Sequence, residues 1–390
     1  MIWLEVCFWL CALGIVYVYF GYPLLIAAAA RLFGRTLQPA GQLPRSLSIV
    51  VAAHDEDRAI VRRLKELSEQ IARVGIPGEI IVLSDGSTDN TAELARGQPD
   101  ADVHVVELDQ RVGKAAALTI GCAEASGEVL VFADVRQTWA TDALCRLVES
   151  FRDPTVGAVS GNLLLESAPR ALSGVGLYWH LEKWLRGQES RLHSLTGVTG
   201  AISAVRRQLF RPIPAGTLLD DVYWPLHVAM QGRRVIHEEQ AIAYDRLPSE
   251  ASQEFRRKVR TLCGNIQLLK LCPAALLPWR NPVWFQLISH KFLRLAVPWA
   301  LLLLLVGSII LPGPIYRVCL AAQLALYGLG LLGMQNDGRS RLALTNVASS
   351  FLVLNGAAVW SIAVWITRRS DRIWRKATFD PAPAEYAGQV

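Results

Sequence analysis

Membrane-length apolar runs lie near both ends of the chain and leave one long polar segment between them. The first run, Ile2 to Ala30, carries a single charged residue, Glu5, and is long enough to cross a bilayer as a helix. Three more runs follow the polar segment: about Leu295 to Leu311, Val318 to Met334 and Leu342 to Ile366. Together with a hydrophobic content of 52%, these runs predict a folded domain anchored to a membrane by spanning helices.

The basic residues around the first run predict its orientation. Arg31 and Arg35 follow it and no Lys or Arg precedes it, which places the N-terminus outside and the next domain in the cytoplasm. We therefore expect a multi-pass protein of the inner (plasma) membrane. The expected organisation is a transmembrane helix (1–30), a cytoplasmic domain (31–282), an interfacial helix (283–294), three transmembrane helices (295–367) and a basic tail (368–390).

The tail leaves the number of spans open. Four spans put the C-terminus outside, yet the tail segment RRSDRIWRK has five cationic residues, which favour the cytoplasmic side. Either the tail departs from the usual charge bias or one apolar run does not cross the bilayer.

The net charge of +6 is explained by the membrane and not by nucleic acid. Arginines cluster beside the apolar runs, where they suit the anionic headgroups of membrane lipids. The basic residues are not interleaved with aromatic residues on one soluble face, so we expect no nucleic-acid partner.

Within the polar segment, short β-rich runs alternate with amphipathic stretches. The strand-like runs are Ser46 to Ala53, Glu79 to Asp85, Val103 to Leu108 and Glu128 to Asp134, and the clearest helix-like stretches are Asp57 to Ala72 and Gly113 to Ala125. This alternation predicts an α/β domain with a mostly parallel, Rossmann-like sheet. Ligands of such sheets bind beyond the carboxyl ends of the strands, which is where Asp55, Glu56, Asp85 and Asp134 fall.

The residues after these strands point to a phosphate-bearing ligand. Asp85 begins the turn-rich segment DGSTDNT and can accept hydrogen bonds from a base or ribose, whereas Asp89 fits a helix cap better. Lys114 follows Gly113 at the start of a helix, where it can pair with phosphate or simply face solvent. Asp134 ends an apolar strand and can hold Mg²⁺ or Mn²⁺ with help from substrate phosphates. The alternative for Asp134 is an ion pair with Arg136.

Two later motifs add a base and further cations. Asp220 and Asp221 precede a helix, and we expect one of them to cap that helix while the other faces the cleft with a raised pKa, as a general base requires. On the helix that follows, Arg257, Arg260 and Gly264 share a face, where two guanidiniums can hold a diphosphate or bind headgroups.

The ordered set VVAAHDED, DGSTDNT, GKAAAL, FADVR, GVTGAISAVRR, LDD and RKVRT resembles the membrane-bound family 2 glycosyltransferases, which are GT-A-fold enzymes related to cellulose, hyaluronan and poly-N-acetylglucosamine synthases. The resemblance covers residues 46 to 265. It implies inverting transfer of a sugar from a nucleotide diphosphate sugar, most simply a UDP-sugar, to a hydroxyl of a polysaccharide or lipid-linked acceptor, in exopolysaccharide or cell-surface polysaccharide synthesis.

The resemblance also assigns roles to individual residues. Asp221 becomes the catalytic base, with Asp220 in the place of the acid that precedes it. Thr199 and Gly200 match the loop beside the acceptor. The remaining matches bind the nucleotide sugar, with Asp134 also holding the metal: Asp55, Glu56, Asp85, Lys114, Asp134, Arg257 and Arg260.

The sequence departs from the family pattern at two positions. Arg136 replaces the second acid of the DxD motif, so metal binding rests on Asp134. Thr261 replaces the tryptophan of the QxxRW motif, which supports the growing chain in processive synthases. Processive synthesis, transfer of a single sugar to a lipid-linked acceptor, and an inactive nucleotide-binding scaffold therefore stay open.

Overall fold

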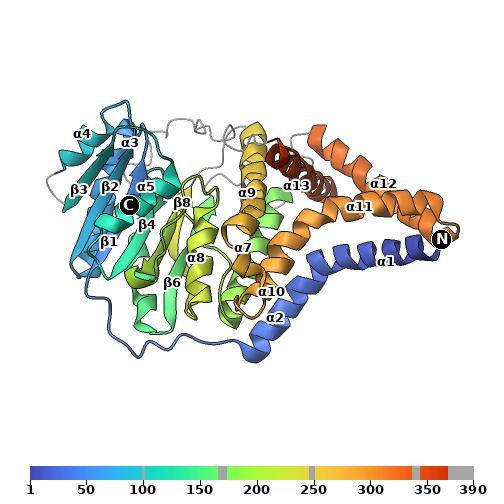
Figure 1. The fold of residues 1–390 in the computed structure, drawn as a ribbon, viewed down its shortest axis with the longest axis horizontal. Helices are drawn as coiled ribbons and strands as arrows, with labels where there is room; N and C mark the ends of the chain where they lie inside the picture. Colours follow the sequence, from blue (N-terminus) through green and yellow to red (C-terminus); the bar gives the residue numbers. More distant parts are fainter. Residues whose placement is uncertain (99–101, 166–173, 246–250, 336–342, 368–390) are drawn as a thin grey trace.

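The computed structural model describes the whole chain except residues 99–101, 166–173, 246–250, 336–342 and 368–390 (Figure 1). The predicted basic tail therefore lies outside the described residues. A sheet with helices on both faces occupies one end of the molecule, and long apolar helices occupy the other end, where the N-terminus lies (Figure 1).

The sheet has eight strands in the order β3-β2-β1-β4-β7-β6-β8-β5. Neighbours among β1 to β4 are parallel, β7 runs antiparallel to both β4 and β6, and β8 is parallel to β6. The strands are β1 (Leu47–Ala53), β2 (Gly78–Asp85), β3 (Val103–Leu108), β4 (Val129–Ala133), β5 (Thr138–Trp139), β6 (Val156–Leu165), β7 (Ile202–Arg206) and β8 (Arg234–Asp245).

The helices cover both faces of this sheet and continue into the apolar end. They are α1 (Ile2–Val16), α2 (Tyr22–Phe33), α3 (Asp57–Val74), α4 (Thr91–Arg96), α5 (Lys114–Glu124), α6 (Ala143–Glu149), α7 (Gly174–Leu192), α8 (Asp220–Met230), α9 (Ala251–Leu271), α10 (Trp284–Gln286), α11 (Leu293–Ile310), α12 (Pro314–Gln335) and α13 (Ala343–Ile366). Two π-helical segments, η1 (Tyr17–Gly21) and η5 (Leu287–Phe292), join neighbouring helices.

Side-chain alternation along the strands produces two hydrophobic cores. Ile49 and Val51 of β1 face one core with α3 and α6, while Val50 faces the other with α5 and α8. On α3, Ile60, Leu64 and Leu67 are fully buried because they recur at helical spacing. The strand β1 thus reads as a continuous apolar run, as expected of a strand covered on both faces.

The predicted α/β class with a mostly parallel sheet is confirmed. The four predicted strands differ from β1 to β4 by at most one residue at either end, and the two predicted helices coincide with α3 and α5. Beyond β4 the sheet becomes mixed, because β7 enters it between β4 and β6 in the opposite direction. The sequence reasoning did not foresee β6 to β8.

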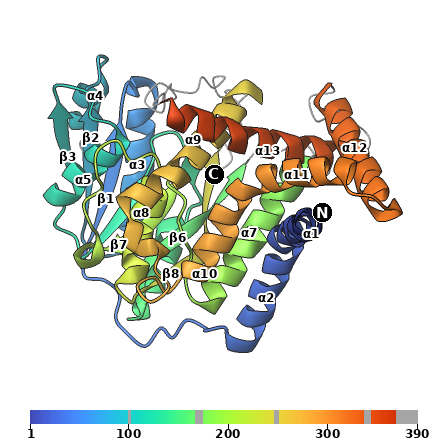
Figure 2. The same cartoon turned by 45° about the vertical axis from the view of Figure 1, so that its right-hand side comes forward.

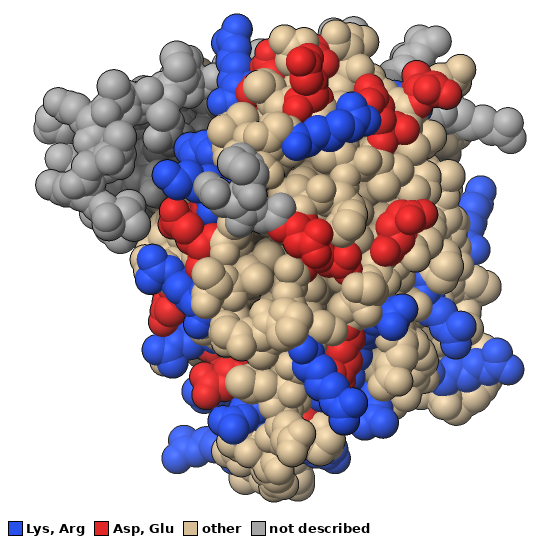
Figure 3. All heavy atoms as spheres, turned by 90° about the vertical axis from the view of Figure 1, so that its left-hand side faces the viewer, with Lys and Arg blue, Asp and Glu red and all other residues tan. Residues whose placement is uncertain are grey.

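Four helical stretches among the described residues are long and apolar enough to cross a membrane: Ile2–Phe33, Trp284–Ile310, Pro314–Gln335 and Ala343–Ile366. They carry many exposed apolar side chains, such as Trp3, Leu302 and Trp360. By contrast, charged residues of both signs are scattered over the face at the opposite end of the molecule (Figure 3). The molecule is therefore divided into a lipid-compatible end and a water-compatible end.

The predicted interfacial helix is not a separate element. Residues 284–310 form one uninterrupted helical stretch, in which α10, η5 and α11 follow one another directly. The helical stretch continues from His290 and Arg294 into the apolar residues of α11, although Pro298 lies inside that helix. Polar and apolar parts therefore belong to one continuous helical stretch.

Two helices, α7 and α9, connect the sheet domain to the candidate spans (Figure 2). Helix α2 packs on α7, and α13 packs on both α7 and α9. Val259 and Cys263 of α9 are buried with Ala357 and Val364 of α13. Helices α7 and α9 of the sheet domain are thus in direct contact with membrane-type helices.

Candidate active site

A cavity lies at the carboxyl end of β4, between α5 and α8. Its walls contain a lysine and three aspartates that the sequence analysis selected, together with apolar side chains. The principal lining residues are Lys114, Asp134, Val198, Gly200, Asp220, Asp221 and Trp224. The strand-end position predicted for the site is therefore where these side chains converge.

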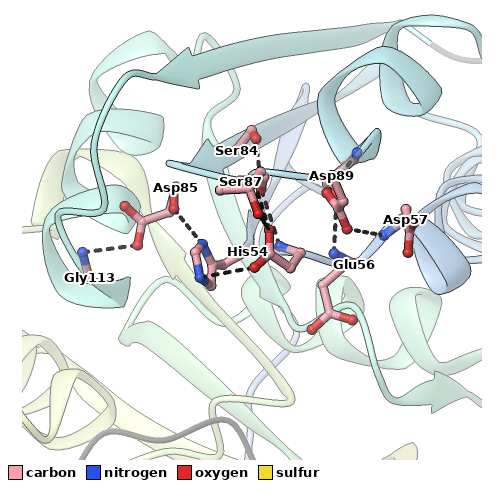
Figure 4. Close-up of polar contacts among 11 residues, drawn as sticks. His54, Glu56, Asp57, Ser84, Asp85, Ser87, Asp89 and Gly113 are labelled. Carbon is pink, nitrogen blue, oxygen red and sulfur yellow. Dashed lines mark hydrogen bonds and ion pairs between the residues drawn. The ribbon is translucent and has the colours of Figure 1, made fainter. Parts of the chain in front are cut away.

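Asp85 holds the loop that precedes α5. Its two carboxylate oxygens accept hydrogen bonds from the main-chain N–H groups of Val112 and Gly113, at 2.6 and 2.9 Å, and its main-chain oxygen is 2.7 Å from His54 Nδ1 (Figure 4). Gly113 has a φ of +88°, which a residue with a side chain rarely adopts. Asp85 is only 4% exposed. Asp85 therefore fixes this loop. The sequence had suggested a different arrangement, in which its carboxylate is open to a base or ribose.

The segment after β1 is tied to the turn after β2. Asp55 accepts a hydrogen bond from the main-chain N–H of Thr88 at 2.8 Å, and Asp89 accepts one from Asp57 at 3.1 Å. Asp89 also accepts from the N–H of Thr91, the first residue of α4, which agrees with its predicted structural role. The carboxylate of Glu56 points away from this network (Figure 4).

Lys114 and Asp134 form an ion pair inside the cavity. Lys114 Nζ donates to Asp134 Oδ1 at 2.7 Å, and the side chains are 27% and 33% exposed. Burial alone would lower the pKa of Lys114, but the charges of Asp134, Asp220 and Asp221 raise it above its ordinary value. A permanently charged ammonium therefore stands among three carboxylates.

Arg136 does not pair with Asp134, so that alternative is wrong. Its guanidinium donates instead to both carboxylate oxygens of Asp245, at 3.0 and 2.7 Å. Asp245 is the last residue of β8, which lies beside β5. Arg136, which replaces the second acid of the DxD motif, thus fastens the loop between β4 and β5 to the end of β8.

Neither Asp220 nor Asp221 caps a helix, contrary to expectation. Helix α8 begins at Asp220, and its N-cap position is Leu219, which offers no side-chain oxygen. Oδ1 of Asp221 is buried and accepts no hydrogen bond from the described residues. Burial, reinforced by the charge of Asp220, raises the pKa of Asp221 to about 6, against the opposing charges of Lys291, Lys114 and Arg260.

On α9, Arg260 and Gly264 lie near the start of α8. The positive charge of Arg260 acts on Asp221. A Cβ at Gly264 would lie only 2.4 Å from Leu219 Cγ, so glycine permits the close approach of the two helices. The predicted close contact at Gly264 is thus made by Leu219 of the protein and not by a ligand. Arg257 lies on α9 one turn before Thr261.

The loop that contains Thr199 and Gly200 lies between Lys114 and Asp221. The N–H of Val198 donates to the main-chain oxygen of Asp221 at 2.8 Å, and the N–H of Thr199 donates to Ser160 Oγ at 3.0 Å. A Cβ at Gly200 would lie 3.2 Å from Lys114 Nζ. The predicted acceptor loop therefore forms one wall of the cavity that holds the predicted base.

Residues 48–213 match the family model described as Glycosyl transferase family 2. Residues 48–213 therefore form a family 2 glycosyltransferase domain. The matched segment contains all the predicted site residues before Asp220, and Asp220, Asp221, Arg257 and Arg260 lie beyond it.

The glycosyltransferase domain has relatives among poly-beta-1,6-N-acetyl-D-glucosamine synthases. The enzyme of Staphylococcus aureus strain COL is 27% identical over 236 residues, which are 57% of this chain and 55% of that protein. The enzyme of Staphylococcus epidermidis is 24% identical over 237 residues, 58% of this chain and 56% of that protein. The chain thus spans about half the length of the curated relatives it matches.

A solved structure resembles nearly the whole chain. The mannosyltransferase from Pyrobaculum calidifontis, in complex with GDP-Man and Mn²⁺, superposes with a TM-score of 0.68 at 22% identity, covering 94% of this chain and 99% of that one. This likeness confirms the predicted GT-A fold with its flanking helices.

The acids of the glycosyltransferase domain fit a divalent cation that takes most of its ligands from elsewhere. Among the described residues no group of three or more His, Cys, Asp or Glu side chains forms a metal cage. Asp134 nevertheless opens into the cavity, and Mg²⁺ or Mn²⁺ in phosphate-transfer sites is commonly held by one or two carboxylates plus substrate phosphates. The donor set therefore suits a metal that arrives with its substrate.

Arg63 is a site-supporting residue that sequence reasoning missed. Its side chain is fully buried, Nε donates to the main-chain oxygen of Asp134 at 3.0 Å, and its guanidinium stacks 4.6 Å from the ring of Trp139. In the sequence it stands beside Arg62 on an amphipathic helix and looks like another solvent-facing arginine. Its place between Ile60 and Leu64, both fully buried, was the available signal.

Proposed function

We propose that this chain is an inverting glycosyltransferase that moves a sugar from a nucleotide diphosphate sugar to an acceptor hydroxyl at the membrane. The observation that carries the proposal is the single cavity lined by Lys114, Asp134 and Asp221, in which a cation, a metal-competent acid and a carboxylate of raised pKa face one another. These are the three kinds of group that displacement of a nucleoside diphosphate requires.

The donor is a nucleotide sugar, in the first instance a UDP-sugar. Asp55 and Glu56 lie just beyond the end of β1 and would hold the nucleoside, while Asp85 at the end of β2 would act indirectly, by fixing the loop that contains Val112 and Gly113. Asp134 would hold Mg²⁺ or Mn²⁺ together with the diphosphate. When bound, the metal supplies positive charge to the leaving group.

Asp221 is the base in this proposal. It removes the proton from the acceptor hydroxyl while the hydroxyl oxygen attacks the anomeric carbon, and the bond from that carbon to the diphosphate oxygen breaks. Lys114 and Arg260 stabilise the negative charge of the departing nucleoside diphosphate. A pKa of about 6 leaves Asp221 ionised at neutral pH yet basic enough to take part. Displacement from the opposite face inverts the anomeric centre.

The acceptor is an exopolysaccharide or another cell-surface polysaccharide, in keeping with the poly-beta-1,6-N-acetyl-D-glucosamine synthases among the relatives. Thr199 and Gly200 would contact it. The four candidate spans and the basic residues next to them fit a multi-pass protein of the inner membrane, in contact with its lipids and with the catalytic domain in the cytoplasm.

Transfer of a single sugar to a lipid-linked acceptor is the second candidate function. The observation that favours it is Thr261, whose hydroxyl donates to the main-chain oxygen of Arg257 at 3.0 Å and so turns back onto its own helix. A side chain in that position offers no flat surface for a terminal sugar. Product length in a membrane assay separates the two candidates.

The decisive experiment is a screen of the purified full chain against UDP- and GDP-sugars, including UDP-N-acetylglucosamine and GDP-mannose, with Mn²⁺ or Mg²⁺. We expect nucleotide binding as a thermal shift, and nucleoside diphosphate release that depends on an added acceptor. A chain that binds nucleotides without releasing or transferring sugar from any donor would be a scaffold, and the proposed activity would be wrong.

A further inference from the structure

Helix α7 carries three charged residues at helical spacing, Glu182, Arg186 and Glu189. None of them belongs to the motifs of the predicted site. Both glutamates are engaged by the membrane-type helices, and the arginine between them is engaged by the acceptor loop. Helix α7 therefore connects two regions that the proposed reaction must bring together.

On the membrane side, His290 of η5 lies between the two glutamates. Its Nδ1 is 2.8 Å from Glu189 Oε1, and its Nε2 is 2.9 Å from Glu182 Oε2. Arg294 donates to the other oxygen of Glu182. Tyr22 of α2 donates to Glu189 at 2.5 Å, so the first and second candidate spans meet on the same face of α7.

These contacts are buried and charged. Glu189 is 1% exposed, and the side chain of His290 is 8% exposed. Burial alone would raise the pKa of Glu182, but the positive charges of Arg294 and His290 hold it well below its ordinary value. Removing one partner from a buried pair leaves an uncompensated charge, so this cluster admits few alternative arrangements.

On the catalytic side, one nitrogen of Arg186 reaches the acceptor loop. Nη2 donates to the main-chain oxygen of Gly197 at 3.1 Å and to Ser160 Oγ at 3.2 Å. Ser160 Oγ also accepts the N–H of Thr199. The N–H of Val198, the residue between Gly197 and Thr199, donates to the main-chain oxygen of Asp221. A short chain of hydrogen bonds thus runs from Arg186 through the loop to the proposed base.

We infer that Arg186 is a positioning residue for sugar transfer. It holds the loop 197–200 against Asp221. Its position depends on helix α7, which it shares with Glu182 and Glu189; the charges of both glutamates act on it, and His290 of the membrane-type helices contacts both. The inference rests on the proposed function for its consequence in catalysis, whereas its structural part stands independently. Donor binding does not depend on this chain of contacts, because Asp55, Asp85 and Asp134 are held by other loops.

The test compares R186K with R206K in the purified full chain. Lysine keeps the charge of Arg186 but lacks the planar fork that reaches two acceptors. Arg206 is a matched control: its guanidinium also donates to main-chain oxygens, those of Val156 and Phe151, but β7 places it beside Val129, at the end of β4 opposite to Asp134.

We expect R186K to lower kcat for transfer by roughly 10- to 100-fold, because a small misplacement of reacting groups is costly. The thermal shift given by UDP or GDP with Mn²⁺ should stay near that of the wild type, and R206K should transfer normally. H290Q should lower kcat as well, and the double variant R186K/H290Q should be less impaired than the product of the two single effects. Normal transfer by R186K, or equal loss of nucleotide binding and transfer, would overturn the inference.

Hydrogen exchange supplies a readout that needs no activity. The amides of Val198 and Thr199 are hydrogen-bonded in the structure and should exchange faster in R186K and H290Q, but not in R206K. Unchanged exchange in R186K contradicts the inference whatever the activity. A wild type that transfers no sugar while R186K exchanges faster contradicts the proposed function and leaves the positioning contact supported.

Discussion

The two halves of the candidate active site are held in place in different ways. The proposed nucleotide half consists of loops after β1, β2, β3 and β4, and contacts such as Asp85 to Gly113 and Asp55 to Thr88 fasten the first three of these loops to one another. The half that contains Asp221 depends on α7 and α9, which pack against candidate membrane spans. One half is completed within the sheet domain, and the other is completed at its junction with the apolar helices.

This difference has a chemical consequence. Donor binding should survive disturbances of the membrane-type helices, because its loops do not contact them through the described hydrogen bonds. Transfer should not survive them, because the acceptor loop and the base are reached through Arg186 and Arg260. The comparison therefore predicts that binding and transfer can be separated by mutation.

The largest expected separation comes from D221N. Without a base, transfer should fall by roughly 100- to 10,000-fold, while nucleotide binding measured by thermal shift changes little. The raised pKa means that the ionised carboxylate is disfavoured in the folded protein, so Asp221 contributes stability that is lost as pH rises through about 6. Above that pH, D221N should melt at a higher temperature than the wild type. Substantial transfer by a folded D221N protein would remove Asp221 from the mechanism.

D134A should weaken donor binding, which D221N leaves nearly unchanged. Loss of a charge-assisted contact costs roughly 1.5–3 kcal/mol, which corresponds to about a 10- to 100-fold weaker donor affinity in the presence of Mn²⁺. EDTA should weaken binding to the wild type and have little further effect on D134A. Arg136→Lys serves as a control, because Arg136 lies two residues away and pairs with Asp245. Binding that is indifferent to both EDTA and D134A would show that Asp134 holds no metal.

The sequence predicted the strands and strand-end acids of the proposed nucleotide half well because that half is local. Its strands are apolar runs of the right length, and each acid stands directly at a strand end, so periodicity and turn chemistry were sufficient. The roles of individual acids were harder: both oxygens of Asp85 are taken by main-chain N–H groups 27 and 28 residues along the chain.

The other half could not be predicted in the same way because its contacts join distant segments. Arg186 and Ser160 are 26 residues apart, and His290 and Glu182 are 108 residues apart. The antiparallel insertion of β7, which brings the acceptor loop beside β4, has no signature in local composition. A resemblance to a family selected Asp221 rather than Asp220 as the base and supplied Thr199, where physical patterns alone offered a base at one of two adjacent acids and no role for the loop.

The pH dependence of transfer tests the electrostatics of the base half. Asp221 must be ionised to accept a proton, so kcat/KM should decline as pH falls through about 6. Burial is the main cause of the raised pKa and the charge of Asp220 is the next, while Lys291, Lys114 and Arg260 oppose both. In D220N the acidic limb should therefore move to lower pH. A limb that stays in place, or moves upward, would contradict the assignment of Asp221 as the titrating base.

The smallest effect should come from packing between α9 and α8. In G264A the new methyl group meets Leu219, the residue before Asp220. Such overpacking lowers the free energy of unfolding by roughly 1–3 kcal/mol. A slight shift of α9 changes the distance from Arg260 to Asp221, so transfer should decline a few-fold with no change in donor affinity. The matched control is G328A on α12, where a Cβ meets no atom within 4 Å. Equal behaviour of the two variants would mean that the contact between α9 and α8 does not set the geometry of the base.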